Sequence, residues 1–378
     1  MEGWLENPKS EIRNPKSQPR GNSEFRIPNS ELDGWSGVRV ILIRLSAFGD
    51  IVHTWPLAVA LRGADPGIHI SWVVEAPFSP LVEGHPSIDA VFTARTRTWR
   101  HNPLSSSTRA EIALLRGRFH ELQPDLAIDS QGLVKSALIC RWTGAQRRVG
   151  LARPWRRERL AGLAYTQTVR GSPIGTHVAA TNLELVRAVG GDPPALTPPD
   201  GSWLLDRARA LETADVSPKH PYAVVLPGAG GAHKVLAETT LAAVSRELAG
   251  SGLEVVVAWG PGEIDRARRV VEGAGTGVRM APPTNILELS LLLGGAALVI
   301  GGDTGPVHLA ASFSVPTVAV FLASDSRRNG PLGAKTAVVA AAQEVTGAPG
   351  GSARARPALQ VGSAEIVDSA RKLLESSN

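Results

Sequence analysis

Apolar runs of strand length alternate with longer amphipathic stretches along most of the chain. The first run, Val38 to Leu45, is rich in β-branched residues and is typical of a parallel strand buried on both faces. It opens a first series of predicted strands at 38–45, 68–75 and 125–129 and predicted helices at 55–62, 105–121, 132–142 and 177–189. Strands that alternate with helices predict a parallel sheet covered on both faces.

A second alternating series follows the Pro-rich polar segment 191–201, which is typical of a domain margin. Its predicted strands lie at 222–227, 253–258, 297–301 and 316–321, and its predicted helices at 237–249, 263–273, 285–294 and 305–313. Residues 346–359 predict a loop, and 363–374 predict an amphipathic helix. We therefore expect an α/β protein with two Rossmann-like, doubly wound domains facing a central cleft, at 37–200 and 201–360, followed by a C-terminal helix at 361–378.

The first 36 residues have a different character. Asn7-Pro8-Lys9-Ser10 recurs as Asn14-Pro15-Lys16-Ser17, and no apolar periodicity precedes Val38. Such a segment buries too little apolar surface to offset the entropy lost on ordering. We predict that residues 1–36 form a disordered N-terminal extension.

Composition and charge narrow the class of protein. Cys140 is the only cysteine, which excludes an intrachain disulfide and a thiolate metal cluster. No apolar run approaches the ~18 residues of a membrane span, and the polar start lacks a signal-peptide core, so we expect a cytoplasmic protein. Between Arg95 and Arg159, 14 Lys and Arg residues outnumber 5 Asp and Glu residues. This basic band is either a solvated surface or a binding surface for polyphosphate, nucleic acid or anionic lipid.

Asp50 follows the first predicted strand, at the end of the loop Ser46-Ala47-Phe48-Gly49-Asp50. This position faces the ligand crevice of a doubly wound sheet, so Asp50 is a candidate general base. Asp is also a favoured helix N-cap, and position alone leaves both roles open. The loop lacks the G-x-G-x-x-G pattern of dinucleotide-binding loops, which disfavours an oxidoreductase.

A second candidate loop lies between a predicted strand and the predicted helix at 305–313. It contains Asp303, Thr304 and Gly305, and Pro306 and His308 occupy the first helical turn. Pro suits the first turn of a helix, and the free amides of that turn suit a pyrophosphate. An ordinary strand-to-helix turn is the structural alternative, and His308 is equally compatible with packing.

Two further loops of the second series could complete a nucleotide site. A glycine-rich loop contains Gly228 and Gly230 and leads to Lys234, which can neutralise phosphate. Glu263 follows another strand, where a carboxylate can bind a ribose diol or stabilise a helix N-terminus. The chain has no Asp-x-Asp motif, and its nine histidines form no ligand-spaced pair, so metal-dependent transfer is disfavoured.

Together these motifs resemble a known family. From about Val38 onward the chain resembles the lipopolysaccharide heptosyltransferases of glycosyltransferase family 9, and the type I enzymes most closely. The stretches that carry the resemblance are Ser46–Thr54, Trp72–Glu75, Asp129–Ser136 and Asp303–Gly305 with His308.

The resemblance implies a GT-B fold with an N-terminal acceptor-binding and a C-terminal nucleotide-sugar-binding domain. It implies inverting, metal-independent transfer of L-glycero-D-manno-heptose from ADP-heptose to the Kdo sugar of lipid A, without a cofactor. The implied partners are these two substrates and the cytoplasmic face of the inner membrane, which the protein contacts peripherally. Nucleic acid is not an implied partner, and the protein is expected to be a monomer.

The resemblance also implies roles for individual residues. Asp50 is the implied base, and Lys234 stabilises the departing pyrophosphate. The implied donor-binding residues are Gly228, Gly230, Glu263, Asp303, Thr304, Gly305 and His308. The implied acceptor-binding residues are Ser46, Arg97, Trp99, Arg100, Gln131, Lys135 and Arg141, because guanidinium groups suit carboxylate and phosphate.

The chain departs from the family pattern on the donor side. Val235-Leu236-Ala237 follows Lys234 where Trp-Pro is usual, Ser324-Asp325-Ser326 replaces Thr-Asp-Pro, and Pro331-Leu332-Gly333 lacks the usual aromatic. A related glycosyltransferase with another nucleotide sugar or acceptor is therefore an alternative. A non-catalytic two-lobed nucleotide- or sugar-binding protein is a third, which retention of Asp50 disfavours because binding alone needs no base.

Overall fold

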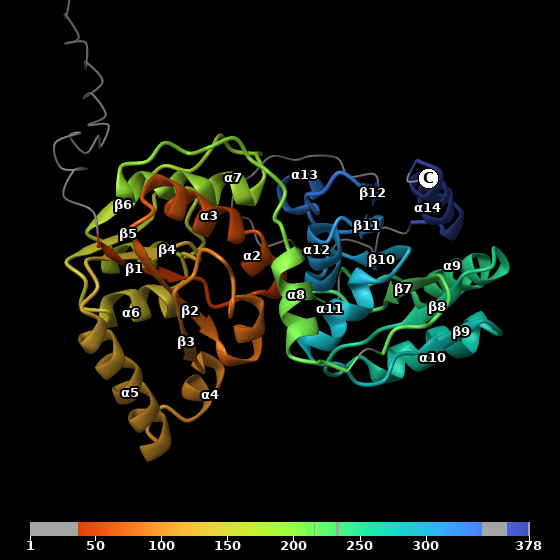
Figure 1. The fold of residues 1–378 in the computed structure, drawn as a ribbon, viewed down its shortest axis with the longest axis horizontal. Helices are drawn as coiled ribbons and strands as arrows, with labels where there is room; N and C mark the ends of the chain where they lie inside the picture. The colour runs from red at the N-terminus through yellow and green to blue at the C-terminus, as the bar shows by residue number, and fades with distance from the viewer. Residues whose placement is uncertain (1–36, 215, 232–233, 342–360, 377–378) are drawn as a thin grey trace, which may run out of the picture.

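The computed structural model describes residues 37–214, 216–231, 234–341 and 361–376. The predicted N-terminal extension and the predicted loop at 346–359 lie outside these residues. The chain forms two α/β units side by side, the first drawn in red to yellow and the second in green to blue (Figure 1).

The first unit is built on a six-stranded parallel sheet with strand order β3-β2-β1-β4-β5-β6. The central strand β1 has no exposed side chain from Val40 to Ile43, which explains its unbroken apolar sequence. The strands are β1 (Arg39–Ile43), β2 (His69–Glu75), β3 (Ala90–Ala94), β4 (Leu126–Asp129), β5 (Arg147–Leu151) and β6 (Gln167–Val169).

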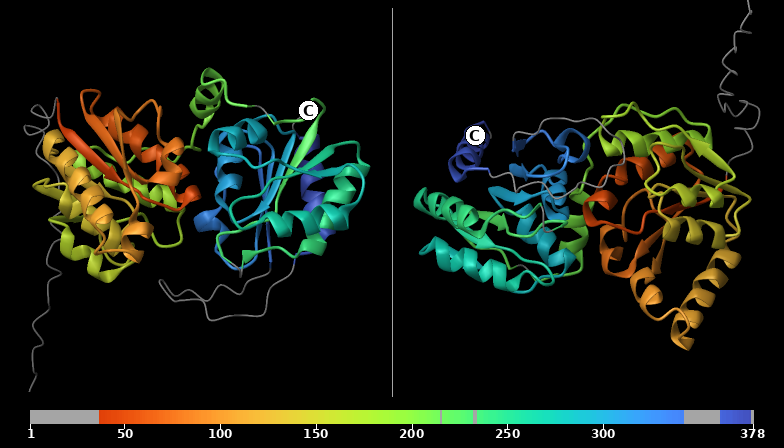
Figure 2. Two further views of the ribbon diagram at one scale, coloured as in Figure 1. Left: turned by 90° about the horizontal axis from the view of Figure 1, so that it is seen from below. Right: turned by 180° about the vertical axis from the view of Figure 1, so that it is seen from behind.

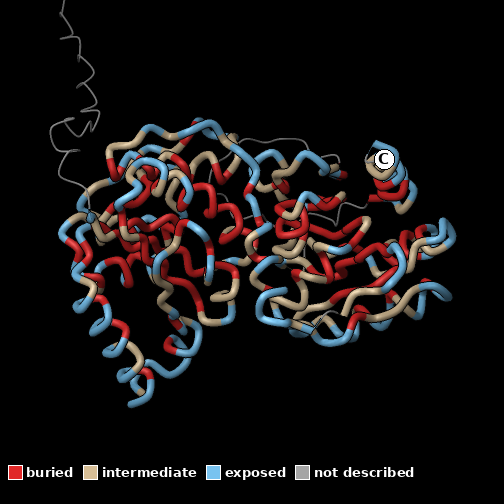
Figure 3. The backbone as a smooth tube through the Cα atoms, viewed as in Figure 1, coloured by how far each residue is buried: buried red, intermediate tan, exposed pale blue. Residues whose placement is uncertain are grey.

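Helices cover both faces of this sheet. Buried side chains of one core unite the sheet with α2 (Phe48–Val52), α3 (Trp55–Ala64), η1 (Ala76–Leu81) and η3 (Glu184–Val189), and α7 (Val178–Leu183) packs against α3 and η3. On the opposite face a separate core contains side chains of α4 (Thr96–His101), α5 (Ser106–Leu122) and α6 (Val134–Trp142). The short 3₁₀ helix η2 (Arg159–Ala164) packs against α6. Most of α5 is exposed (Figure 3).

The second unit repeats the same topology, with strand order β12-β11-β10-β7-β8-β9. Its strands are β7 (Tyr222–Leu226), β8 (Glu254–Val257), β9 (Val278–Met280), β10 (Leu298–Gly302), β11 (Thr317–Phe321) and β12 (Thr336–Ala340). One face is covered by α9 (Glu238–Gly250), α10 (Ile264–Ala274) and α14 (Ser363–Glu375), and the other by α11 (Ile286–Gly294) and α12 (Gly305–Ser312). The short helix α13 (Ser326–Asn329) follows β11. The two parallel sheets confirm the predicted α/β class.

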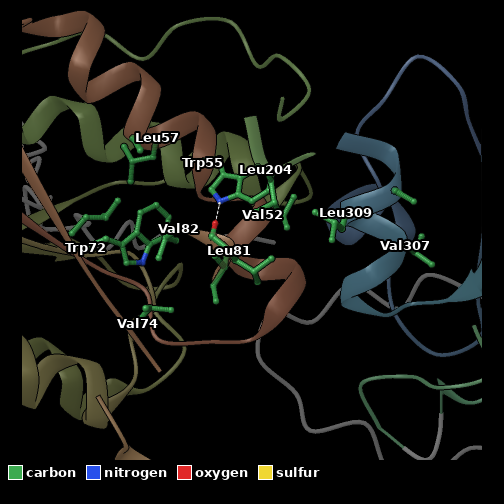
Figure 4. Packing of buried hydrophobic residues seen from close by; sticks show 14 of the residues in the cluster. Val52, Trp55, Leu57, Trp72, Val74, Leu81, Val82, Leu204, Val307 and Leu309 are labelled. Carbon is green, nitrogen blue, oxygen red and sulfur yellow. Dashed lines mark hydrogen bonds between the residues drawn. The ribbon is translucent and has the colours of Figure 1, made fainter. Parts of the chain in front are cut away.

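One hydrophobic core continues from the first unit into the second. Val307 and Leu309 of α12 belong to the same cluster as Val52 and Trp55 of the first unit (Figure 4). Helix α8 (Ser202–Ala210) lies at the junction, as Figure 2 shows from two sides. Its Trp203 contacts Trp55 at a ring-centroid distance of 5.3 Å. The two units are therefore packed together rather than merely linked.

The structure corrects some sequence predictions. The single helix predicted at 177–189 is wrong, because α7 is followed by the separate 3₁₀ helix η3, which ends at Gly190 with φ 78°. Both segments pack against α3, so tertiary packing sets their conformation. The elements that the pattern missed are short or weakly apolar, namely the strands β3, β5, β6, β9 and β12, the helices α2, α4, α8 and α13, and the 3₁₀ helices η1 and η2.

Candidate active site

The first turns of α2 and α12 meet where the two units join. Each helix follows the carboxyl end of a central strand, β1 or β10. A Cβ atom added to Gly49 would lie 2.5 Å from His308 Cδ2, and one added to Gly305 would lie 2.4 Å from Phe48 Cβ. Glycine at both positions therefore permits a close approach that a side chain would prevent.

Asp50 lies in this junction as the third residue of α2. The N-cap of α2 is Ala47, so the structure corrects the alternative that Asp50 is the N-cap. The Ala47 amide donates to Asp50 Oδ2 over 3.3 Å. Asp50 thus supports the helix start from within the first turn, and its side chain remains 26% exposed.

Two arginines of the first unit flank the Asp50 carboxylate. Arg44 Nη2 lies 3.0 Å from Asp50 Oδ1, is almost fully buried, and its other terminal nitrogen donates to the Ser130 carbonyl. Arg157 Nη1 lies 3.9 Å from Asp50 Oδ2 and is 61% exposed. Burial alone would raise the pKa of Asp50, but Arg44, Arg157 and the Ala47 amide lower it below 3.8. Asp50 is therefore ionised at neutral pH.

The second unit contributes a third arginine, Arg328 of α13. Burial lowers its pKa, the Asp50 carboxylate raises it, and Arg157 and Arg44 lower it, so Arg328 lies within the field of this cluster. Sequence reasoning missed all three arginines. Arg44 carried a signal, as a charge within an apolar strand, whereas Arg157 and Arg328 had none beyond the basic composition of their segments.

Lys135 belongs to a polar cluster that includes Ser46, in the loop that leads to Asp50. Its Nζ contacts Ser46 Oγ at 3.5 Å, Thr96 Oγ1 at 3.4 Å and Glu75 Oε1 at 3.6 Å. Gln131 accepts from the Leu45 amide over 2.9 Å and donates to Ser46 Oγ over 3.3 Å. The structure thus brings Ser46, Gln131 and Lys135 together, and adds Glu75 and Thr96, which sequence reasoning did not select.

Asp129 fixes the loop that carries these residues. Its buried carboxylate accepts from the amides of Gln131 and Gly132 and from the hydroxyls of Ser136 and Tyr165. Burial raises the pKa of Asp129, and these four hydrogen bonds partly offset the effect. Asp129 is a positioning residue for Gln131 and Lys135.

The remaining predicted acceptor residues lie farther out on α4 and α6. Arg97 and Arg100 are exposed on α4, and Arg141 is exposed in the last turn of α6. Trp99 belongs to the core beneath α4, and its indole donates to Glu111 Oε2 over 2.8 Å. This burial favours packing over acceptor contact for Trp99.

Across the junction, Asp303 holds the groups of the second unit. Its carboxylate accepts from Lys234 Nζ and from Ser324 Oγ, each over 2.6 Å, and His308 Nε2 lies 3.7 Å away. Burial would raise the pKa of Asp303, but the neighbouring His308 and the hydrogen bonds from Lys234 and Ser324 lower it far below its ordinary value. Asp303 therefore holds Lys234 and His308 near the N-terminus of α12.

The glycine-rich loop and Glu263 lie against each other. A Cβ added to Gly228 would overlap the Glu263 carboxylate, at 1.8 Å from Oε1, so a side chain there would displace this carboxylate. Glu263 Oε2 accepts from the Gly260 amide over 2.8 Å, and the Gly230 amide donates to the Asp303 carbonyl over 3.4 Å. The predicted donor-side loops are thus adjacent in space.

The N-terminus of α12 completes this side. Thr304 is its N-cap without a side-chain capping bond, and Gly305 and Pro306 are its first residues. Thr304 therefore keeps its hydroxyl available for a ligand, and the first amides of α12 suit an anion.

Neither a metal-binding group nor a membrane-spanning helix occurs in the described ranges. No set of three or more His, Cys, Asp or Glu side chains there has an arrangement that could hold a metal ion. None of the helices described has the length and apolar character to cross a bilayer.

Comparison with known proteins places this arrangement in context. The family model of glycosyltransferase family 9 (heptosyltransferase) matches residues 113–348. Lipopolysaccharide heptosyltransferase 1 of Pseudomonas aeruginosa is 33% identical over 287 residues, which cover 75% of this chain and 78% of the relative.

Two solved structures of the E. coli heptosyltransferase WaaC have the same fold. The structure with ADP is 28% identical, with a TM-score of 0.74, and covers 89% of this chain and 100% of that one. The structure with ADP-2-deoxy-2-fluoro heptose is 28% identical, with a TM-score of 0.70, and covers 90% of this chain and 100% of that one.

Proposed function

Because the chain belongs to glycosyltransferase family 9, we propose that it moves L-glycero-D-manno-heptose from ADP-heptose to the Kdo sugar of lipid A. It is a glycosyltransferase with a GT-B fold that transfers heptose in lipopolysaccharide inner-core synthesis. Kdo as the acceptor and the roles of single residues are the finer part of this proposal.

One relationship carries the assignment of the reacting groups. His308 lies 3.7 Å from Asp303, which holds Lys234, and His308 also contacts Gly49, the neighbour of Asp50. An ionised carboxylate of one unit thus lies next to a cationic, amide-rich helix start of the other. This pairing of a base with an anion site supports transfer from a nucleotide diphosphate.

In the proposed reaction, Asp50 accepts the proton of the acceptor hydroxyl. That oxygen forms a bond to the anomeric carbon of the heptose, and the bond from this carbon to the diphosphate oxygen breaks, with inversion. The negative charge that develops on the departing ADP is stabilised by Lys234 and the first amides of α12. In this proposal Glu263 binds the ribose diol, and Gly228, which has no side chain, leaves space for the Glu263 carboxylate.

Binding of the acceptor could raise the basicity of Asp50 by displacing Arg157. In the absence of acceptor, Arg44 and Arg157 lower the pKa of Asp50, which makes it a weak base. Arg157 is exposed and its contact with Asp50 is long, whereas Arg44 is buried. A carboxylate of the acceptor would attract Arg157 away from Asp50 and raise its basicity. Binding of an anionic sugar acid would thus prepare the site for proton transfer.

The proposed setting is the cytoplasmic face of the inner membrane, where the protein acts as a peripherally attached monomer. The basic band supports this, because Kdo carboxylates and lipid A phosphates are anionic. Its Arg97, Arg100 and Arg141 are exposed and so accessible to such groups.

A substrate panel tests the proposal. The purified protein is incubated with ADP-heptose, other ADP-sugars, GDP-sugars and UDP-sugars, and nucleotide release is measured with and without Kdo-lipid A. We expect Kdo-dependent release from ADP-heptose only. Kdo-dependent release from a different sugar nucleotide would favour the related transferase, and binding without release would favour the non-catalytic protein.

A further inference from the structure

The basic band of the first unit lies largely on the layer of helices that covers one face of its sheet. Helices α4, α5 and α6 pack their buried side chains onto this face, and η2 packs against α6. The exposed arginines of this layer include Arg97, Arg100, Arg109, Arg116, Arg141 and Arg159. The outer surface of these helices is therefore strongly basic.

Several apolar side chains are exposed on this basic surface, and four of them lie on α6 and η2. Val134 and Leu138 of α6 are 46% and 48% exposed, and Leu160 and Leu163 of η2 are 65% and 84% exposed. Val134 and Leu138 are four residues apart and share one face of α6 with Arg141. Because α6 and η2 pack together, these four exposed apolar side chains lie on adjacent elements within a basic surface, and we treat them as one group.

The segments that carry this group also contribute side chains to the site. Lys135 lies between Val134 and Leu138 in sequence and contacts Ser46 at the site. Arg157 is three residues before Leu160, and its guanidinium reaches Asp50. An acceptor bound at Asp50 would thus contact the same segments that carry the exposed side chains of α6 and η2.

We propose that Val134, Leu138, Leu160 and Leu163 form the surface by which this protein docks on an anionic bilayer. The apolar side chains enter the boundary between headgroups and acyl chains, and the surrounding arginines bind lipid phosphates. The charge of the surface selects an anionic lipid over a neutral one. This inference rests on the proposed function, in which the acceptor is itself a lipid.

Co-sedimentation of the full chain with vesicles of phosphatidylglycerol and phosphatidylethanolamine tests the surface. We expect the double variant Leu160→Ser and Leu163→Ser to lower the bound fraction about tenfold or more. Val59→Ser is the matched control, because Val59 is 55% exposed on α3, on the opposite face of the same sheet. Equal binding by the double variant and the wild type would overturn the proposal.

A second arm tests the charge and does not depend on the leucines. Arg159→Glu should weaken binding about fivefold or more, and 0.5 M salt or phosphatidylcholine vesicles should weaken binding of the wild type. Arg209→Glu, which changes a 65% exposed arginine of α8, is the control. Binding that ignores lipid charge would contradict the proposed role of the arginines.

Two further measurements separate this inference from the proposed function and from self-association. Transfer to a soluble, deacylated acceptor should be unchanged in the double leucine variant, while vesicle binding falls. Vesicle binding by a wild type that transfers no heptose would leave the docking surface intact and refute the proposed function. A leucine variant that turns a dimer into a monomer in sedimentation, with vesicle binding unchanged, would assign the surface to a second copy of the chain instead.

Discussion

The imidazole rings of His53 and His308 lie 4.4 Å apart between centroids, at an interplanar angle of 70°, although they belong to different units. His177 also contacts His53, at 4.8 Å. Three imidazoles are thus enclosed where the units meet, beside the Arg44 guanidinium. A proton on any of them would add a positive charge to a junction that already contains Arg44, Arg157 and Arg328.

We therefore predict that acid loosens the junction. Burial, His308, His177 and Arg44 lower the pKa of His53 well below 6.5, and burial chiefly lowers that of His177. Since folding favours the neutral rings, this stabilisation is complete above pH 6.5 and is lost as pH falls below it. Calorimetry should show a Tm that falls between pH 7.5 and 5, and less steeply in His53→Phe. His120→Gln, on the exposed surface of α5, should match the wild type; a Tm independent of pH would contradict the prediction.

Asp50→Asn should lower kcat about 10²–10⁴-fold, because it removes the proton acceptor and keeps the size of the side chain. Affinity for ADP should be unchanged, since the proposed donor groups lie on the other unit. Steady-state kinetics and titration calorimetry measure the two effects. A variant with near wild-type kcat would show that Asp50 is not the base.

Arg157→Ala should change the pH profile as well as acceptor affinity. Loss of the guanidinium raises the pKa of Asp50, so the acid limb of kcat/KM should move to higher pH. The KM for the acceptor should also rise, because an anion-binding group is lost. Arg153→Ala is the matched control, as an exposed arginine of the same segment. An acid limb that stays in place would refute the coupling between Arg157 and Asp50.

Lys234→Ala should weaken ADP-sugar binding about 10–100-fold, as expected for loss of a hydrogen bond to a charged group. The rate should fall as well, because the leaving diphosphate loses its neutralising charge. Lys335→Ala, which changes an exposed lysine of the same unit, should have no effect. Unchanged donor affinity in Lys234→Ala would show that Lys234 does not bind the diphosphate of the donor.

Gly305→Ala should separate the units. The added methyl group would meet Phe48 Cβ at 2.4 Å, so α12 must move away from α2. We expect lower activity and a larger radius of gyration in small-angle scattering. Gly250→Ala, at the end of α9 with open space around it, should instead keep activity and stabilise by about 0.4–1 kcal/mol. Equal scattering profiles for both variants would contradict this account.

The sequence predicted the fold class because the central strands are buried on both faces and so are apolar without interruption. Strands β6 and β9 were missed because each has three residues, with partly buried or exposed side chains. Helix α4 was missed because its sequence TRTWRH contains one buried apolar residue, Trp99. Short elements at sheet edges depend on their neighbours and leave little periodic signal.

The candidate site was predictable where a loop follows a central strand, as for Asp50, Asp303 and Glu263. The electrostatics of the site were not predictable, because Arg157 contacts Asp50 and Arg328 interacts electrostatically with it from segments far away in sequence. Trp99 was predicted to bind the acceptor but is buried in the core beneath α4. The sequence could not show this, because it does not say which side of α4 faces the sheet.

Helix α8 has a mechanical consequence. Trp203 packs on Trp55 and His85, and Arg207 pairs with Glu83 at 2.8 Å, while the same helix packs on α11 of the second unit. A helix that packs on both units can act as a hinge, so we expect the units to open by rotation about α8 and not by translation. Such a rotation preserves the alignment of the two units. Each closure should therefore bring the donor sugar and the acceptor back to the same relative position, without a new search for the reactive orientation.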